Sequence, residues 1–362
     1  MKKRVLHVVT ALTWRGGEQQ AAYLIEELKQ EVDQLVLCSV GSKMEAHCQL
    51  NRIAHFVQQK NGGIDFSYAK RLKWTCVSEK IDLIHVHDAH AHTFSILAAS
   101  VFGNKTPIVL SRRVDFPIKN NIFSHFKYNH KQIKKILCVS DTIRRITAKG
   151  IKDVSKLVTV YSGINLEKFK SDSGKFKSEL GLDKNDFLIG NTSALADHKD
   201  YFSFIDVAEK LISKHGNCYF VIIGDGPMKK EIHQYAESKK MENKIIFTGF
   251  RNDVPEILAE LDLFLITSKT EGLGTSILDA FACNVPVVGT AGGGITELVE
   301  NGKTGLLCEV KNVDQIAEAV ERMIAQRDLR VTCAKNAFAK VQVFSKQETA
   351  KNTLKYYSEL LS

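Results

Sequence analysis

The stretch LDLFLITSKTEGLGTSILDAFACNVPVVGTAGGGITELV, residues 261–299, decides the fold of the second half of this 362-residue chain. It opens with an apolar run, 261–266, whose length and composition are typical of a buried parallel strand. A loop that contains Glu271 follows, and a second short strand at 286–288 runs into the glycines 292–294, after which another helix is expected. The helix between the two strands carries its apolar residues on one face: Ile277, Leu278, Phe281 and Ala282. Alternating strands and helices predict an α/β sheet.

The start of the helix after Glu271 is suited to a charged ligand. Glycines around a helix start let anionic atoms approach bare backbone N–H groups, which favour a phosphate or a developing anion. Glu271 can accept hydrogen bonds from hydroxyls, and Asp279 lies about two turns further along, on roughly the same face. Two carboxylates beside a ring of amides suit a nucleotide attached to a sugar; the alternative is an ordinary strand–loop–helix unit with two solvated acids. The amides at this helix start are those of residues 273–276, and the candidate substrate-binding residues of the loop are Gly272, Leu273, Gly274 and Thr275.

Glu271 and Asp279 at this spacing resemble the E-x7-E signature of the retaining, nucleotide-sugar-dependent glycosyltransferases of the GT4 family. The glycine segment up to Glu297 and the segment 301–305 resemble the next landmarks of that family. The resemblance implies an α/β protein of the GT-B fold, with two doubly wound Rossmann-like domains that face a cleft. It is specific across 161–307 and looser across the first half. Asp279 departs from the family pattern, because the second acid, which holds the ribose hydroxyls, is shorter here by a methylene.

The length allows two domains, and the composition is that of a soluble globular protein. The chain has 44% hydrophobic and 25% charged residues, and no apolar run is long enough to span a bilayer. The basic and apolar N-terminus breaks at 13–15 without a small-residue cleavage site, so we expect a first β-strand rather than a signal peptide. The eight cysteines are scattered singly, which predicts buried free thiols in a reducing cytoplasm.

We expect three parts in the chain: an acceptor-side Rossmann-like domain at 1–165, a nucleotide-sugar domain at 166–344, and a terminal helix at 345–362. The boundary is placed near 165–176, because residues 158–165 resemble the strand and hinge between the family's two domains. In the resembled architecture the terminal helix packs back on the first domain.

The positive charge is unevenly distributed. Residues 1–165 hold 25 Lys and Arg against 13 Asp and Glu, whereas residues 166–362 hold 25 against 28. The excess indicates an anionic partner for the first half: a membrane surface, an acidic glycolipid or nucleic acid. The resemblance favours the first two, so no nucleic-acid partner is expected; the alternative is a merely soluble basic surface. The basic, aromatic-bearing segment 119–135 is the candidate amphipathic patch for a membrane surface.

The loop Gly16-Gly17-Glu18 follows the first predicted strand and precedes a helix. Strand, glycine loop and helix begin a dinucleotide-type unit whose amides point at the ligand. In the resembled family this loop reaches the donor phosphates and the acceptor.

Four histidines in eight residues, from His85 to His92, suggest a metal site at first sight. However, the spacing differs from the H-x-H-x-D-H pattern of metallo-β-lactamase-type hydrolases, because the acid, Asp88, stands one place too early. Alternation puts His85 and His87 on one side of a strand, and the resembled family has H-x-H at the end of this strand. We therefore expect His85 and His87 to line the substrate cleft, with a metal-dependent hydrolase as the alternative.

Arg113 stands where many members of the resembled family have a histidine near the reaction centre. An arginine there could hold a phosphate or an acidic acceptor, and the alternative is a surface salt bridge with Asp115.

In the second half, Lys199 matches a family lysine that clamps the diphosphate, while the companion arginine is missing near Ser193 and Ala194. Gly224 ends a predicted strand. Phe250 and Arg251 end another and flank the base in the resembled family; the alternative for Arg251 is an exposed loop cation.

The resemblance implies transfer of a sugar from a nucleotide diphosphate to a glycan or glycolipid hydroxyl, with retained anomeric configuration, in bacterial polysaccharide or lipopolysaccharide synthesis. Glu271 would orient the donor sugar and Lys199 would stabilise the leaving diphosphate. No D-x-D occurs in the chain, so neither a metal nor another cofactor is expected. We expect a cytoplasmic enzyme, peripheral at the inner face of the plasma membrane. The alternatives are a nucleotide-sugar epimerase of the same fold, a nucleotide-sugar-binding protein without transferase activity, and the metal-dependent hydrolase.

Overall fold

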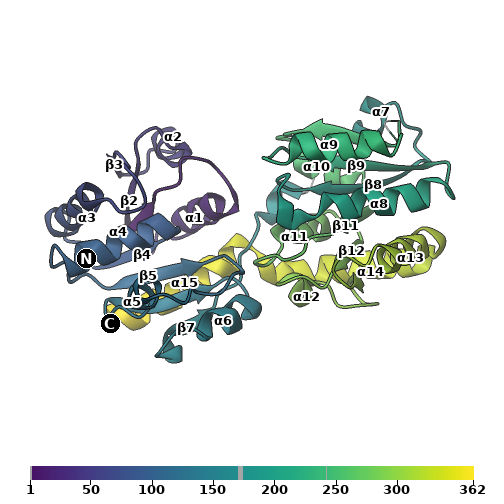
Figure 1. Cartoon of the computed structure of the whole chain (residues 1–362). Helices are drawn as coiled ribbons and strands as arrows, with labels where there is room; N and C mark the ends of the chain where they lie inside the picture. Colours follow the sequence, from purple (N-terminus) through teal and green to yellow (C-terminus); the bar gives the residue numbers. More distant parts are fainter. Residues whose placement is uncertain (1, 170–173, 242) are drawn as a thin grey trace. The chain divides into compact units, whose positions relative to one another are not determined.

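The computed structural model describes residues 2–169, 174–241 and 243–362, and the chain divides into two compact units (Figure 1). Unit 1 contains the chain up to Gly163 together with Lys346–Ser362, and unit 2 is Ile164–Ser345. The sequence placed these boundaries at 165/166 and 344/345. Residues 170–173, inside the predicted boundary region, lie outside the described residues.

Unit 1 is built on a parallel sheet in the order β3-β2-β1-β4-β5-β6-β7. Its strands are β1 (Arg4–Val9), β2 (Asp33–Ser39), β3 (His55–Gln58), β4 (Leu83–Val86), β5 (Ile108–Arg112), β6 (Ile133–Cys138) and β7 (Leu157–Thr159). The helices of the unit are α1 (Gly16–Glu27), α2 (Lys43–Leu50), α3 (Phe66–Ser78), α4 (Ala89–Ser100), α5 (Ile122–Tyr128), α6 (Asp141–Ala148) and α15 (Lys346–Leu361).

The terminal helix α15 completes one core of unit 1. Its Tyr357 and Ala350 pack in one buried cluster with Val5 of β1, Leu83 of β4 and Leu137 of β6. Lys346, at the start of the helix, forms ion pairs of 2.8 Å with two glutamates near the end of α1, Glu26 and Glu27. The chain therefore returns to unit 1 after unit 2 and buries an aromatic side chain there.

Unit 2 repeats the architecture with a parallel sheet in the order β10-β9-β8-β11-β12-β13. Its strands are β8 (Phe187–Thr192), β9 (Cys218–Ile223), β10 (Ile245–Gly249), β11 (Leu263–Ile266), β12 (Val287–Thr290) and β13 (Gly305–Cys308). Its helices are α7 (Phe176–Glu179), α8 (Tyr201–Ile212), α9 (Lys229–Ser238), α10 (Val254–Ala259), α11 (Thr275–Ala282), α12 (Ile295–Leu298), α13 (Val313–Ala325) and α14 (Arg327–Val341).

The stretch 261–299 folds as its pattern predicts. The apolar run gives the buried strand β11, and all four predicted apolar residues of α11 are buried. The eight cysteines are free, and seven of them are buried. The segment 119–135, predicted as an amphipathic patch, is divided between α5, which covers 122–128, and β6, which begins at Ile133.

The order of strands reverses once in each sheet. In unit 1 the reversal lies between β1 and β4, and in unit 2 between β8 and β11. Open α/β sheets bind ligands outside the carboxyl ends of the strands at such a switch point. The loops after these four strands are therefore the places to look for a site. Among the described helices, none has the length and hydropathy needed to span a membrane.

Candidate functional site

An ion pair between Lys199 and Glu271 lies at the switch point of unit 2. Lys199 ends the short 3-10 helix Asp197–Lys199 after β8, and Glu271 lies in the loop after β11. The Lys199 Nζ and Glu271 Oε1 atoms are 2.5 Å apart, and the Ser268 hydroxyl donates to the same oxygen at 2.7 Å. Only 15% of the Lys199 side chain and 10% of the Glu271 side chain are exposed. The two residues proposed as catalytic from the sequence thus form one partly buried unit.

Hydrogen bonds between the two loops hold this pair in place. The Thr267 hydroxyl donates to the Asp200 carbonyl at 2.9 Å, and the Lys269 amide donates to the His198 carbonyl at 2.8 Å. A second ion pair, between Lys269 and Asp197, spans 2.8 Å. Because the loops are joined through both backbone and side chains, the position of Glu271 relative to β8 is fixed.

The glycines that follow β12 pack directly against the backbone of the Glu271 loop. Gly293 has φ +62, and a Cβ there would lie 2.7 Å from the Glu271 amide nitrogen, closer than a side chain tolerates. The Gly294 amide donates to the Glu271 carbonyl at 2.8 Å. The glycine cluster therefore supports the backbone of Glu271, which is a role the sequence did not assign to it.

Helix α11 begins immediately beyond Glu271. Its N-cap is Gly274, in the left-handed region at φ +90, and no side chain caps this end of the helix. Leu273 is buried, while Gly272 and Thr275 are half-buried. A helix start without a side-chain cap leaves backbone donors for an anion.

Asp279 is a half-buried carboxyl on α11. Burial raises its pKa to about 7, and Lys168 opposes this shift. Within the described residues, no hydrogen bond or ion pair reaches its carboxylate. A carboxyl group in this state has unused acceptor capacity at neutral pH, which suits a ligand with hydroxyl groups.

The remaining predicted residues of unit 2 differ in how far other residues already contact them. Gly224 has φ +149, and a Cβ there would clash with the Ser193 carbonyl. The Phe250 side chain is 73% exposed after β10. Arg251, however, is held by Glu179 and Asp253 in ion pairs of 2.6 Å each. These two carboxylates raise its pKa and compensate its charge, so Arg251 is a paired, half-buried cation rather than the exposed loop cation considered from the sequence.

In unit 1, the predicted glycine loop forms the first turn of α1. Gly16 and Gly17 are its first two residues, and Glu18 accepts a hydrogen bond from the Arg15 amide at 2.8 Å, which caps the helix. A Cβ on Gly17 would lie 4.0 Å from the Cδ atom of Arg113. The glycine loop and Arg113 are therefore neighbours.

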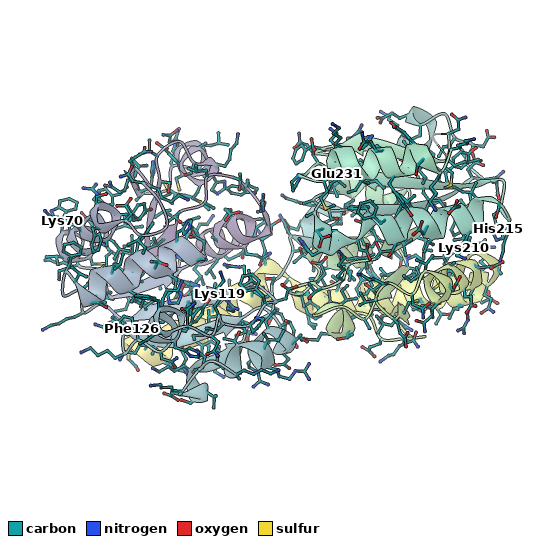
Figure 2. The ribbon with its side chains drawn as sticks, viewed as in Figure 1. Lys70, Lys119, Phe126, Lys210, His215 and Glu231 are labelled. Atoms are coloured by element: carbon teal, nitrogen blue, oxygen red, sulfur yellow. The ribbon has the colours of Figure 1, made fainter. Side chains whose placement is uncertain are left out.

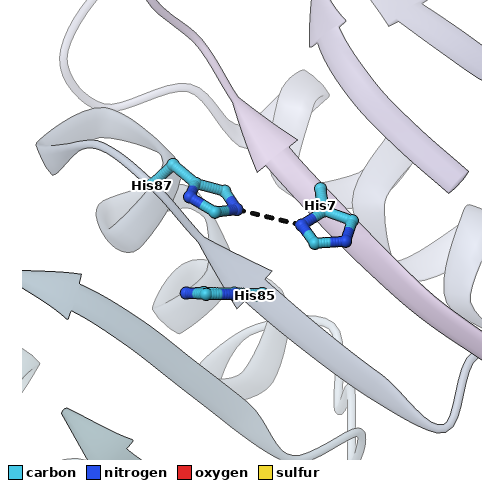
Figure 3. A group of neighbouring side chains, drawn as sticks. All are labelled: His7, His85 and His87. Carbon is cyan, nitrogen blue, oxygen red and sulfur yellow. Dashed lines mark hydrogen bonds between the residues drawn. The ribbon is translucent and has the colours of Figure 1, made fainter. Parts of the chain in front are cut away.

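Three histidines, His7, His85 and His87, lie close together at the switch point of unit 1 (Figure 3). His85 lies on β4, His87 directly follows that strand, and His7 lies on β1, paired in register with His85. Their exposed fractions are 0% for His7, 1% for His85 and 6% for His87. The predicted common face of His85 and His87 is thus correct, but both are buried rather than arranged along an open surface.

These histidines form a hydrogen-bonded cluster. His7 Nδ1 and His87 Nε2 are 3.0 Å apart, and His7 Nε2 lies 3.0 Å from Gln34 Oε1. His85 contacts the Tyr357 hydroxyl at 2.5 Å and the Ser111 hydroxyl at 2.8 Å. Burial lowers the pKa of His7 to about 4 and holds the pKa values of His85 and His87 well below the usual range.

The three rings offer nitrogens close enough together to share a metal ion. Neutral imidazoles are suitable ligands, but a metal would have to replace hydrogen bonds that these nitrogens already make. The rest of the predicted histidine run does not join them: His90 lies 3.5 Å from Lys60, and His92 donates to the Lys127 carbonyl at 3.2 Å.

Arg113 extends this cluster toward α1. Its Nη1 donates to the His87 carbonyl at 3.0 Å, and its Nη2 lies 3.3 Å from His87 Nδ1. Burial lowers its pKa to about 10, so it remains charged at neutral pH. No ion pair of the described residues includes Arg113, and the salt bridge with Asp115 considered from the sequence does not form.

Sequence reasoning missed His7 and Ser268, which contact the predicted site residues His87 and Glu271, and Gln34, which contacts His7. A histidine inside a strand carries no motif, and its relation to β4 depends on which strands pair.

Comparisons with known proteins agree with this geometry. The family "Glycosyl transferases group 1" matches residues 172–340, and "Glycosyltransferase Family 4" matches residues 14–168. The chain is 28% identical to the N-acetyl-alpha-D-glucosaminyl L-malate synthase of Bacillus anthracis, over 73% of this chain and 71% of that protein. It is 26% identical to the UDP-Gal:alpha-D-GlcNAc-diphosphoundecaprenol alpha-1,3-galactosyltransferase of Escherichia coli, over 70% and 69%.

Solved structures show the same fold. Anabaena Alr3699/HepE in complex with UDP-glucose matches with a TM-score of 0.87 at 21% identity, over 98% of this chain and 99% of that one. A glycosyltransferase from Rickettsia africae also matches with a TM-score of 0.87, at 22% identity, over 100% and 99%. The two matched families together extend from residue 14 to residue 340. The chain belongs to the GT4-type glycosyltransferases and is a hexosyl-transferring enzyme of the GT-B fold.

Proposed function

We propose that this enzyme moves a sugar from a nucleoside-diphosphate sugar to a hydroxyl group of a glycan or glycolipid, with retention of the anomeric configuration. The observation that carries the proposal is the Lys199–Glu271 pair at the switch point of unit 2. It places a cation for a diphosphate and a carboxylate for sugar hydroxyls at one point, beside the start of α11.

On the donor side, Lys199 would stabilise the diphosphate as it leaves, together with the first amides of α11. A positioned cation lowers the barrier because the charge develops where the donors already point. Glu271 would accept hydrogen bonds from the hydroxyls of the donor sugar. Its two hydrogen-bond donors, Lys199 and Ser268, hold the same oxygen, Oε1, so Oε2 remains for the sugar.

The nucleoside would be held by the residues around this pair. Asp279 has free acceptor positions for the ribose hydroxyls, and the exposed ring of Phe250 can stack on a base. Gly224 allows the loop after β9 to approach the loop after β8. Structures such as Anabaena HepE hold UDP and glucose, which makes a UDP-sugar the first donor to test.

We propose a membrane-embedded or acidic glycolipid acceptor, bound through unit 1, in cell-surface polysaccharide or lipopolysaccharide synthesis. The galactosyltransferase of Escherichia coli named above acts on a diphosphoundecaprenol-linked sugar. In unit 1, Gly16, Gly17 and Glu18 lie with Arg113 at the carboxyl ends of β1 and β5. This half of the chain carries the net positive charge.

An apolar patch that we call the α5 patch supports peripheral membrane binding. It consists of Phe116, Ile122, Phe123 and Phe126, which are 55%, 79%, 82% and 54% exposed. Exposed aromatic and aliphatic side chains near lysines are typical of interfacial membrane anchors. Figure 2 shows Phe126 projecting from α5, with Lys119 on the preceding loop. The enzyme would then work at the inner face of the plasma membrane.

A donor-turnover experiment tests the proposed reaction. Purified protein is incubated with UDP-, GDP- and ADP-linked hexoses and a membrane lipid extract, and product sugars are followed by proton NMR of the anomeric signal. We expect transfer from one donor with retained configuration. An inverted product, or an interconverted free donor without transfer, would contradict the proposal.

A further inference from the structure

The hydrogen-bond partners of His7 and His87 fix the protonation of both rings. The Gln34 Nε2 atom donates to the Ile25 carbonyl at 2.8 Å, so Gln34 Oε1 faces His7 Nε2. A carbonyl oxygen can only accept, and His7 Nε2 must therefore carry the proton. His7 is neutral, and its Nδ1 atom accepts from His87 Nε2.

The tautomer of His87 also fixes the direction of its hydrogen bond with Arg113. Because His87 is neutral and its Nε2 carries the proton, its Nδ1 atom can only accept. The facing atom is Nη2 of Arg113, which can only donate. These hydrogen bonds form a chain from Arg113 through His87, His7 and Gln34 to the Ile25 carbonyl, which we call the relay. In each of them the donor lies on the Arg113 side. Hydrogen bonds aligned in this way strengthen one another.

Arg113 is the charged end of this relay, and no carboxylate of the described residues forms an ion pair with it. Within the same part of the chain its hydrogen bonds go to the carbonyl and to a neutral ring nitrogen of His87. Glu18 and Asp88 raise its pKa from a distance, but neither forms an ion pair with it. Glu18 caps α1, and Asp88 accepts from both the amide and the hydroxyl of Thr10 at 2.6 Å.

Arg113 has N–H donors that no described residue uses. The guanidinium has five N–H groups, two of which contact His87. Its Nε atom is buried without a partner in the part of the chain that the structure describes, and the side chain lines a small cavity with His85, Ser111 and Ser162. Arg251 offers the contrast, because two carboxylates neutralise it. A cation held only by neutral groups costs desolvation free energy, which an incoming anion offsets.

We propose that His7 and His87 are positioning residues whose fixed tautomers hold Arg113 as an uncompensated cation for a phosphate or carboxylate group of a substrate. This inference rests on the proposed function. The shared ligand chemistry is an anionic group. It can come from the donor diphosphate or from an acidic acceptor, and the experiment separates these sources.

The tautomers are measured directly on the full-length protein labelled with nitrogen-15 histidine. Long-range proton–nitrogen NMR spectra distinguish the two neutral tautomers from the charged ring, and the His7→Asn and His87→Asn variants assign the signals. We expect both rings to be neutral with the proton on Nε2 between pH 6 and 8, an interval around the ordinary histidine pKa near 6.5. A charged ring at pH 7, or a proton on Nδ1 of either residue, would overturn the relay. This measurement does not depend on turnover, so a failure of the relay can be distinguished from a failure of the proposed function.

Ligand binding is read at the same nuclei. UDP is titrated first, and inorganic phosphate is then added to the UDP-saturated protein. A shift of His87 Nδ1 with UDP assigns the donor diphosphate to Arg113, and a shift only with phosphate assigns an acceptor anion. Whichever of these shifts the wild type shows should vanish in Arg113→Met. No response to either probe, or an unchanged response in Arg113→Met, would overturn the anion site.

The matched variants His87→Asn and His87→Leu test positioning. Asparagine places an acceptor oxygen close to the position of Nδ1, whereas leucine cannot accept. We expect His87→Leu to weaken binding of the responding anion about tenfold or more, the loss expected for a hydrogen bond to a charged group, with His87→Asn close to wild type. His7→Leu should weaken binding as His87→Leu does, although His7 does not touch Arg113. Its matched variant is His7→Asn, which keeps an acceptor oxygen close to the position of Nδ1. Equal binding by all four variants would contradict the relay.

Discussion

The Lys199 ammonium and the Glu271 carboxylate lie 2.5 Å apart although 72 residues separate them in the chain. Their contact joins the two loops at the switch point of unit 2. We predict that Glu271→Ala abolishes transfer, and that Lys199→Met lowers turnover by about 10²–10³-fold, the usual loss for one electrostatic stabiliser of a leaving group. Turnover of the donor measures both effects, and the circular dichroism spectrum should stay that of the wild type. Near wild-type transfer by Glu271→Ala would remove its catalytic role.

The Lys199–Glu271 pair also predicts that the effects of single substitutions on the free energy of unfolding do not add in the double variant. Each single variant leaves a partly buried charge without its partner, which costs about 1–3 kcal/mol, whereas the double variant leaves neither charge. Urea unfolding of Glu271→Gln, Lys199→Met and the double variant measures the coupling. If the two single effects simply add, the pair is not coupled in solution.

Asp279 should bind the nucleotide through its carboxylate. We predict that Asp279→Glu keeps nucleotide affinity, because it restores the longer reach found in the resembled family. Isothermal titration with UDP tests this, with Asp279→Leu as the variant that cannot accept hydrogen bonds. A large loss of affinity in Asp279→Glu would show that the carboxylate does not contact the ligand.

The raised pKa of Asp279 also predicts a pH dependence of folding. Its pKa is about 7 in the folded protein and near 3.8 when unfolded, so the folded state binds its proton more tightly. This carboxyl therefore lowers stability progressively as the pH rises from about 4 to about 7. Asp279→Asn should stabilise the protein at pH 8 by about 1 kcal/mol or more and have little effect at pH 4. Urea titrations at the two pH values measure the difference, and equal effects at both would contradict the shift.

Activity should survive exhaustive treatment with EDTA. Lys199 and backbone donors supply the charge needed at the diphosphate, and the histidine nitrogens already have protein partners. Turnover is compared before and after chelation, with zinc added back as the control. Inactivation that zinc reverses would make His7, His85 and His87 a metal site.

Binding to anionic vesicles should depend on salt and on the α5 patch. Each basic residue near an anionic membrane contributes on the order of 1 kcal/mol, and salt screens this attraction. We predict co-sedimentation of the wild type at low salt and its loss at high salt or in Phe123→Ser/Phe126→Ser.

Charge reversals within the segment 119–135 refine this test. The lysines of its second half are Lys127, Lys131, Lys134 and Lys135. Lys131 and Lys134 are exposed, but Lys127 contacts the Thr93 hydroxyl at 3.2 Å and Lys135 pairs with Glu359 at 3.4 Å. Lys131→Glu/Lys134→Glu should therefore weaken binding most. The matched control, Lys230→Glu/Lys335→Glu, changes the same charge at exposed positions of unit 2. Equal losses in both double variants would indicate a non-specific charge effect.

The fold and the local motifs were predictable because they depend on short-range patterns. Buried parallel strands are continuous apolar runs, so β11 and α11 could be located from residues 261–282 alone. Alternation along one strand likewise placed His85 and His87 on the same face.

The contacts between motifs were not predictable, since they depend on strand pairing. The position of His7 beside His85 follows from the register of β1 on β4, which no local pattern encodes. The resemblance to the GT4 family pointed to Arg113 and Arg251 alike. Only the structure shows that Arg251 is paired with two carboxylates while Arg113 is held by neutral groups.

Saturation-transfer NMR with a panel of nucleotide sugars tests the central claim most directly. The wild type, Lys199→Met and Glu271→Gln are compared at equal concentration against UDP-, GDP- and ADP-linked hexoses. We predict that one nucleotide sugar binds to the wild type, that Lys199→Met loses most of this binding, and that Glu271→Gln loses contacts to the sugar protons but keeps those to the base. Equal binding by all three proteins, or no binding of any nucleotide sugar to the wild type, would contradict the assignment of this site.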